Sequence, residues 1–590
     1  MIATRPADLS DHQAADGADP SAPLTTRPAL VTALSHATRL ALLACAGLLI
    51  QIAWVAVWTL SYRLTHGDGF SYQFLVAQTP VWEKLQETLV LANTLAPGVE
   101  PPISIDILAY ALMLAFVVAG IGYLGGVLLI DLGVAAIRGA LVVVIAWELI
   151  FQVTLFLLPG LYTTDIFSYV MYGQISAIYN LNPYIYPPNY FPGNELLNWI
   201  HPIWHDQPSV YGPVWTDLAW VFAKLIQPLE LYQQVLAYKV VMNVVQLLNL
   251  GLVWWLLGRL MTSKKARLVA FTVFAWNPLM LFDGPGNAHN DVLMVTLLLL
   301  GVIPLVLSTR NRNWLLGTFM VGMSALIKYT TGIVGLFYIV PWAATIRGWP
   351  ARIAWLGAAG TLVIGTTLVL FWPWLEFPRA FEPILTAANG KVWQYSNSAP
   401  DIIALHIDNQ VLHEPSTDVD AENHFYLYRD LYSTDTTDST RQNMKNITRG
   451  IFGLFLLWEC WGLWRIAGRR RDKVVDAVLS SSVRAFVVLI VLVLPWVLDW
   501  YWMWPLALAT LLGWQRMLTR VVVAYTLTCL PIFYLHHYWS WNTPSSLIFL
   551  YVVPPLALPV IGWLYQRLAG ERDRPEPVGA MLAAPSVSAE

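Results

Sequence analysis

The stretch "YTTDIFSYVMYG", residues 162–173, follows a long apolar run and a Pro159-Gly160 break. It places one carboxylate, Asp165, at the edge of sequence that is otherwise strongly apolar. A charged side chain at membrane depth costs a few kcal/mol or more, so it normally faces a cavity or a partner. The role of Asp165 therefore depends on which apolar runs cross a membrane and on which side its loop lies.

The composition of the 590-residue chain is typical of a polytopic membrane protein. Hydrophobic residues make up 57% and charged residues only 12%, the mean hydropathy is +0.55, and there are 29 tryptophans. The net charge of −3 comes with no basic patch, so no nucleic-acid partner is expected. The 3 cysteines lie far apart in apolar runs, which excludes a disulfide framework and a clustered thiolate metal site.

Hydropathy predicts an all-α polytopic membrane protein at residues 39–568. A bilayer core about 30 Å thick requires roughly 20 apolar residues per helix. Allowing somewhat fewer residues where a helix is short or broken, we expect about fourteen spans, at residues 39–61, 106–131, 139–159, 235–260, 267–283, 291–308, 314–328, 330–346, 352–372, 449–468, 484–499, 501–515, 519–537 and 546–567. Residues 1–38 and 569–590 are polar and are expected to be disordered cytoplasmic tails.

Clusters of Lys and Arg set the predicted orientation, because such clusters favour the cytoplasmic side. Six short loops carry them: "TSKKAR" (262–267), "TRNRN" (309–313), "IRGWPAR" (346–352), "RIAGRRRDK" (465–473), "RMLTR" (516–520) and "RLAGERDR" (567–574). Two loops on the same side must be separated by an even number of crossings. Both termini are then cytoplasmic.

One interval breaks this even count. Between Arg138 and residues 262–267 there are three candidates, residues 139–159, 211–227 and 235–260. Residues 211–227 are short and carry two charges, so we assign them to an amphipathic helix at the outer interface. The alternative is that residues 235–260 break into two crossings.

With this topology several polar segments share the non-cytoplasmic side. They are a first outer loop (160–234), the turn "GPGNAHND" (284–291), the break "LIKYTTG" (326–332), the segment "VLDWYW" (497–502) and an outer loop at 373–448 with eleven acidic and five basic residues. Each ionisable group alone could be an interfacial charge. Together, Asp165, Asp283, His289, Asp291, Lys328 and Asp499 favour one shared site.

The first outer loop is rich in proline and aromatic residues, in "IYNLNPYIYPPNYFPG" (178–193) and "PSVYGPVW" (208–215). Flat rings suit the apolar faces of sugars. We expect Tyr184, Tyr186 and Trp215, together with Tyr501, to stack on a sugar or acceptor. The alternative is an aromatic belt at the membrane interface.

Four motifs in order, "YTTDIFSYVMYGQISAIYNLNPY", "VYGPVW", "WNPLMLFDGPGNAHNDVLM" and "ALIKYT", resemble the polyprenyl-phosphate-mannose-dependent mannosyltransferases of the GT-C class, particularly the bacterial lipoglycan α-1,6-mannosyltransferases. The resemblance covers roughly residues 139–375, with weaker support from "PWVLDWYWMWP" (495–505). It implies a GT-C fold in the cell membrane, with interfacial helices in the first outer loop. It also implies transfer of a sugar, mannose by expectation, from a polyprenyl-phosphate donor to a hydroxyl of a glycan or lipid acceptor, without a cofactor.

The resemblance also implies that Asp165 is the general base. An acceptor hydroxyl is a poor nucleophile, so a carboxylate must take its proton as the new bond forms. Polyprenyl phosphate leaves readily, so an inverting single displacement requires no acid. Lys328 is the predicted cation for the leaving phosphate. The further donor-binding residues expected are His289, Asn290, Asp291 and Tyr211, with Asp291 orienting His289.

Several alternatives stay open. Asn287 or Asn290 could simply cap the helix that follows the turn. Asp206 is the second choice for the base, while His201 and His205 are expected to be surface residues. No metal is predicted, because the His-x-Asp spacing fits no standard ligand pattern. The donor could carry glucose or arabinose, and a transporter would also collect charges, although no internal repeat supports one.

Overall fold

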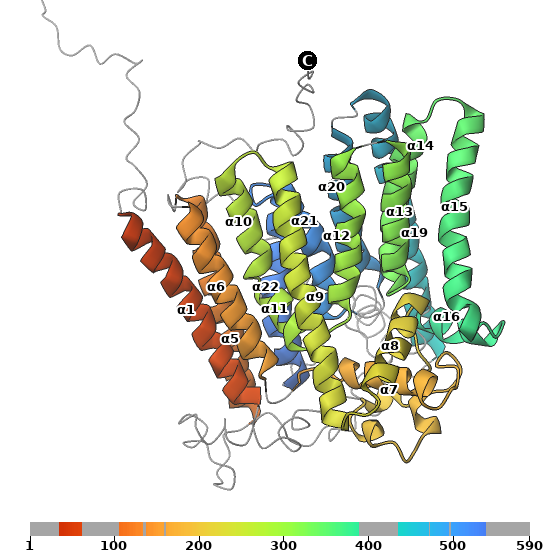
Figure 1. Ribbon diagram of the computed structural model, residues 1–590, viewed down its shortest axis with the longest axis horizontal. Coiled ribbons are helices and arrows are strands. Elements are labelled where there is room, and N and C mark those ends of the chain that lie inside the picture. Colours follow the sequence, from red (N-terminus) through yellow and green to blue (C-terminus); the bar gives the residue numbers. More distant parts are fainter. Residues whose placement is uncertain are drawn as a thin grey trace, which may run out of the picture.

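The computed structural model describes residues 35–61, 105–133, 137–158, 161–308, 310–388, 435–470, 473–494 and 497–538. Its regular elements within these ranges are all helical (Figure 1). The α-helices are α1 (His36–Ser61), α5 (Ile105–Asp131), α6 (Ile137–Phe156), α7 (Asp165–Ala177), α8 (Pro213–Ile226), α9 (Leu231–Leu260), α10 (Lys264–Ala275), α11 (Pro278–Leu281), α12 (Asp291–Leu307), α13 (Asn311–Ala325), α14 (Gly332–Thr345), α15 (Trp349–Phe371), α16 (Glu382–Ala388), α19 (Asp435–Arg469), α20 (Val474–Val488), α21 (Met503–Leu512) and α22 (Met517–Tyr538).

Eight helices in the described ranges are long and apolar enough to cross a membrane. They include α1, α5, α6, α9, α15, α19 and α22, and α20 with the π-helical turn that follows it. A further pair, Pro278–Gly286 and Asp291–Leu307, passes the same test together but is bent by 114°. The all-α polytopic class is thus confirmed, whereas the number of fourteen spans stays a prediction. The expected span at 546–567 and both tails lie outside the described residues.

The first outer loop folds as short helices at one end of the bundle. Helices α7 and α8 lie side by side there (Figure 1), and three 3-10 turns, Pro188–Tyr190, Glu195–Asn198 and Pro202–Trp204, connect them. Helix α8 has 14 residues and is not among the candidate spans. Helix α9 runs unbroken for 30 residues, so the alternative of two crossings in this segment is wrong.

Two expected spans differ from the observed helices. The run at 267–283 is divided between α10 and α11, because Pro278 lacks the N–H that a continuous helix would use and Asn277 caps the new helix through Met280 N. The run at 484–499 is displaced, since α20 begins at Val474 and ends in a π-helical turn, Leu489–Val493.

Figure 1 places the basic connections and the first outer loop at opposite ends of the bundle. The α9–α10 and α14–α15 connections, at which residues 262–267 and 346–352 lie, are at the upper end, and α7, α8 and α16 are at the lower end. The relative arrangement agrees with the predicted topology. Which end faces the cytoplasm stays a prediction.

Helix α9 supports the bent segment through a row of polar side chains. Lys239 Nζ donates to Leu155 O at 3.1 Å, Asn243 Nδ2 to Pro285 O at 3.0 Å, and Asn249 Nδ2 to Val292 O at 2.9 Å. In lipid, carbonyls that a helix break leaves free need partners from the protein. Asn243 and Asn249 therefore hold the bent segment and the start of α12 against α9, while Lys239 holds the end of α6.

The first outer loop is joined to the break after α13 by backbone hydrogen bonds. Gly212 N donates to Ile327 O and Val214 N donates to Leu326 O, each at 3.0 Å. A Cβ at position 212 would lie 2.1 Å from Leu326 O. Because only glycine allows this approach, Gly212 determines where the next residue of the break, Lys328, is held.

Gly212→Ala is therefore expected to lower the thermal unfolding midpoint in detergent. Its free energy of unfolding should fall by at least about 1–3 kcal/mol, the usual cost of overpacking. Gly193→Ala is the matched control in the same loop, because a Cβ at that position would meet nothing within 4 Å. Equal midpoints for the two variants would contradict this account of the contact.

Candidate functional site

Asp165 is the first residue of α7, and its side chain is 16% exposed. A carboxylate at this position is favoured by the positive end of the helix dipole. Tyr169 lies four residues later on the same face, and its hydroxyl donates to Asp165 Oδ2 at 3.3 Å. The other residues of α7 are buried, so Asp165 is the residue of this helix with a partly exposed side chain.

His289 lies directly behind Asp165. Its Nδ1 is 3.4 Å from Asp165 Oδ2, and its ring stacks on Trp500 with a centroid distance of 4.0 Å. The preceding residue, Ala288, has a φ of 61°, in the left-handed region that non-glycine residues rarely adopt. This turn directs a fully buried imidazole toward Asp165.

Asp291, at the start of α12, binds the lysine rather than the histidine. Its Oδ2 is 2.5 Å from Lys328 Nζ, and its Oδ1 accepts from Trp504 Nε1 at 2.6 Å. Asp291 is fully buried, whereas the Lys328 side chain is 14% exposed. The expectation that Asp291 orients His289 is therefore wrong, because both of its oxygens are engaged elsewhere.

The two asparagines of the turn link its parts instead of capping α12. Asn290 Oδ1 accepts from Tyr169 OH at 3.2 Å, and Asn290 makes no side-chain cap on α12. Asn287 Oδ1 accepts from Tyr162 N at 3.0 Å, and its Nδ2 donates to Asp283 Oδ1 at 2.9 Å. The capping interpretation is wrong for both side chains.

Two tyrosines flank Lys328. The centroids of the Tyr211 and Tyr501 rings each lie 5.9 Å from Lys328 Nζ. Such contacts attract a cation weakly and hold its position. The structure thus brings Asp165, His289, Asn290, Asp291, Lys328, Tyr211 and Tyr501 together, as the sequence predicted, but only some of them have exposed surface.

The electrostatics of the cluster favour an ionised Asp165. Burial alone would raise the pKa of Asp165, but the hydrogen bond and charge of His289, the charge of Lys328 and the hydroxyl of Tyr169 together hold that pKa below its usual value. Asp165 is therefore a carboxylate at neutral pH and able to accept a proton.

Other predicted residues lie elsewhere. Tyr184 is fully buried against Phe371, and its hydroxyl is 2.8 Å from Thr216 Oγ1, so its ring has no free face for a sugar. Trp215 is also buried, with its ring centroid 4.9 Å from that of Tyr169. The stacking role is wrong for these two rings, because the loop folds inward on them. For the half-buried Tyr186 it stays a prediction.

The second choice for the base lies at the surface. Asp206 is exposed and accepts a hydrogen bond from Asn189 Nδ2. His201 is buried, so the expectation of a surface residue is wrong there. Within the ranges that the structure describes, no three His, Cys, Asp or Glu side chains gather in a way that could hold a metal ion.

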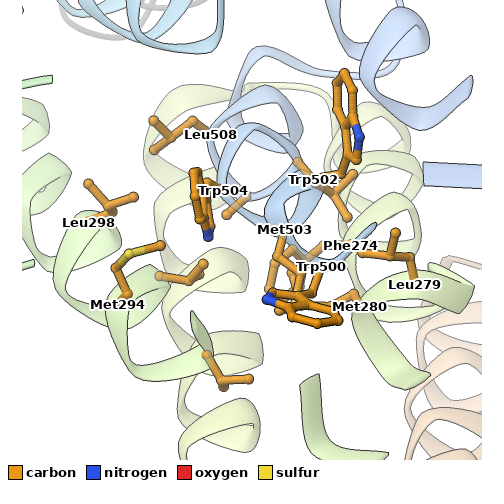
Figure 2. Packing of buried hydrophobic residues seen from close by; sticks show 14 of the residues in the cluster. Phe274, Leu279, Met280, Met294, Leu298, Trp500, Trp502, Met503, Trp504 and Leu508 are labelled. Carbon is orange, nitrogen blue, oxygen red and sulfur yellow. The ribbon is translucent and has the colours of Figure 1, made fainter. Parts of the chain in front are cut away.

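Three side chains that the sequence did not single out complete the cluster: Tyr169, Trp500 and Trp504. Tyr169 could have been found from its spacing of four residues after Asp165 on a helix. Figure 2 shows Trp500 and Trp504 with Met503 on one segment, beside Met280 of α11 and Met294 of α12. Their indole groups connect the hydrophobic core to the polar site.

Known proteins share part of this chain. Residues 74–344 match the family described as alpha-(1->6)-mannopyranosyltransferase, N-terminal domain. Alpha-(1->6)-mannopyranosyltransferase A of Mycobacterium tuberculosis is 27% identical over 203 residues, which cover 34% of this chain and 37% of that protein. A probable alpha-(1->6)-mannopyranosyltransferase of Mycolicibacterium smegmatis is 24% identical over 291 residues, 44% of this chain and 49% of the relative.

Alpha-(1->6)-mannopyranosyltransferase B of Corynebacterium glutamicum is 25% identical over 228 residues, 35% of this chain and 36% of that protein. The chain thus spans less than half the length of each of these curated relatives. The matched region contains Asp165, His289, Asp291 and Lys328. These similarities confirm the resemblance to the α-1,6-mannosyltransferases that the sequence shows.

Proposed function

We propose that this protein transfers mannose from a polyprenyl-phosphate donor to a hydroxyl of a glycan or lipid acceptor, on the non-cytoplasmic side of the cell membrane. The observation that carries the proposal is one buried network that holds two partly exposed groups of opposite charge, Asp165 and Lys328. The names of the relatives support mannose as the sugar.

Asp165 acts as the general base in this proposal. Its carboxylate accepts the proton of the acceptor hydroxyl while the hydroxyl oxygen attacks the anomeric carbon of the donor. The bond between that carbon and the phosphate oxygen breaks, and the phosphate leaves with the electron pair. A single displacement of this kind inverts the configuration at the anomeric carbon.

Lys328 stabilises the charge that develops on the leaving phosphate. Its ammonium has three donors, one of which is used by Asp291, so others are free to bind phosphate oxygens. Asp291 and the two flanking tyrosines hold the ammonium in place before the reaction, and a positioned charge of this kind needs no rearrangement in the transition state.

Labelled donors test which sugar the protein transfers. Membranes that contain the protein are incubated with polyprenyl-phosphate mannose, glucose or arabinose, one at a time, and with an acceptor glycan. We expect label to reach the acceptor only from the mannose donor, with inversion at the anomeric carbon. Transfer from glucose or arabinose instead would change the donor assignment, and no transfer from any of the three would overturn the proposed function.

Asp165→Asn is expected to reduce transfer by about 10²-fold or more, because the amide accepts no proton, while thermal stability and donor binding stay near normal. Transfer is measured as above and donor binding by equilibrium dialysis. The matched control is Asp206→Asn, an exposed acid of the same outer loop, which should transfer at the original rate. The opposite ranking of the two variants would assign the base to Asp206.

Lys328→Ala is expected to weaken donor binding by about tenfold or more with little change in acceptor binding, because the phosphate loses a charged partner. The single substitution also leaves Asp291 buried without its cation, which destabilises the fold. The double variant Lys328→Ala/Asp291→Asn removes both charges and keeps the acceptor oxygen for Trp504. Equal losses of donor and acceptor binding in the double variant would contradict the phosphate role.

A further inference from the structure

The carboxylate of Asp165 is contacted through one of its two oxygens. Tyr169 OH donates to Oδ2 at 3.3 Å, and His289 Nδ1 lies 3.4 Å from the same oxygen. The other oxygen, Oδ1, accepts no hydrogen bond from the described residues, and it is not among their buried atoms that lack a partner. The partly exposed side chain therefore has one oxygen held by the protein and one that is open to a substrate.

The hydroxyl of Tyr169 has two acceptors within reach of its single proton. It lies 3.3 Å from Asp165 Oδ2 and 3.2 Å from Asn290 Oδ1, and its oxygen accepts from Asn290 N at 3.4 Å. A hydrogen bond to an ionised group is about twice as strong as one between neutral groups. The proton of Tyr169 therefore goes to the carboxylate in preference to the amide.

The ring that carries this hydroxyl is fixed by its surroundings. Tyr169 is fully buried, and its ring centroid lies 5.4 Å from that of Tyr211 and 4.9 Å from that of Trp215. Burial is the main cause that raises the pKa of Tyr169 well above its usual value, so the phenol keeps its proton at neutral pH. A donor that is always protonated and cannot move is thus in place before any substrate binds.

We propose that Tyr169 is a positioning residue for Asp165: its hydroxyl holds Oδ2 and thereby presents Oδ1 to the hydroxyl of the acceptor. The terminal torsion of an aspartate is broad, so a carboxylate without such a contact turns about its Cβ–Cγ bond. With Oδ2 held, Oδ1 takes the proton as the acceptor oxygen attacks the anomeric carbon. The inference rests on the proposed function, since it assigns the oxygen that acts within the same base.

The groups around Asp165 decide what the loss of this hydrogen bond should do. Those that face its charge are Tyr169 and Tyr172 from α7, Tyr211 from the first outer loop, His289 from the turn at 284–291, Lys328 from the break after α13, and Tyr501 from the 3-10 turn before α21. Removing a hydrogen bond that favours the ionised form raises the pKa of a carboxyl group. Tyr169→Phe does this without removing a charged residue from the site.

The test is the rate of mannose transfer by the full-length protein in membranes, measured against pH. In Tyr169→Phe the acidic limb of the profile is expected to move to higher pH by about one unit, the lower end of the effect of a hydrogen bond to a charged group. At the optimal pH, kcat should fall by about tenfold or more, because a catalytic group that is free to turn is misplaced. The KM for the donor should change by less than about twofold, since the tyrosine acts through the base. An unmoved limb with an unchanged kcat would overturn the inference.

Tyr172→Phe is the matched control. Tyr172 is a second buried tyrosine of α7, but its hydroxyl donates to Gln207 O at 2.8 Å and not to Asp165. The acidic limb should therefore keep its position in this variant. A shift as large as that of Tyr169→Phe would show that the loss of either hydroxyl acts through the packing of the helix, and it would contradict the inference.

A double variant separates support of the base from support of the fold. Adding Tyr169→Phe to Asp165→Asn is expected to slow transfer by less than about twofold further, because the effects of residues that act as a unit are not additive. A further loss as large as that of Tyr169→Phe alone would show a structural role and overturn the inference.

Asn290→Ala tests which acceptor receives the proton, in a protein that keeps Tyr169. The acidic limb should stay within about half a unit of its original position, since the hydroxyl already donates to Asp165. A shift to lower pH would show that the hydroxyl had donated to Asn290 instead, and it would overturn the inference. Transfer that is absent from the unmodified protein would overturn the proposed function, whereas normal transfer with an unmoved limb in Tyr169→Phe overturns only the role of the tyrosine.

Discussion

The neutralisation of Asp291 is the interaction on which the site depends. A carboxylate taken out of water is tolerated only when its oxygens are hydrogen-bonded and its charge is paired. Asp291 meets this requirement with Lys328 and Trp504, which come from the break after α13 and from the start of α21. Three segments that are distant in sequence are therefore held at one point, because a displacement of any of them would leave a buried charge without a partner.

The side chains of the site differ in burial. His289, Asn290 and Asp291 are fully buried, while Asp165 and Lys328 keep part of their side chains exposed. His289 contacts Asp165, and Asp291 binds Lys328. Asn290 is linked to Asp165 through the hydroxyl of Tyr169. This division suits a reaction in which the base and the phosphate ligand meet the substrates and their supports do not.

The sequence predicted which charged residues share the site, but it did not predict which of them bind each other. Polar residues at the outer ends of apolar runs must face one another or water, so Asp165, His289, Asp291 and Lys328 were expected at one site. The partner of Asp291 depends on how α12 begins after the left-handed turn at Ala288, which hydropathy does not report. Proximity in the sequence suggested His289 as the partner of Asp291, but in the structure its partner is Lys328.

The aromatic residues were the hardest to interpret. In a chain with 29 tryptophans, nothing in the local sequence distinguishes Trp504, which binds a carboxylate, from those that only pack. Proline-rich sequence around Tyr184 suggested an exposed ring, yet the ring is fully buried and packs against Phe371. The predicted helix boundaries were wrong for a related reason, since α10 ends at Ala275 and Asn277 caps α11 within one apolar run.

The row of polar side chains on α9 has a consequence for how this sequence is able to vary. Lys239, Asn243 and Asn249 donate to carbonyls at the end of α6, in the bend after α11 and in the first turn of α12. Replacing them with leucine would make α9 a stronger insertion signal while removing the partners on which the neighbouring turn relies. A gain in the hydrophobicity of α9 would therefore come at the cost of its contacts with α6 and with the bent segment.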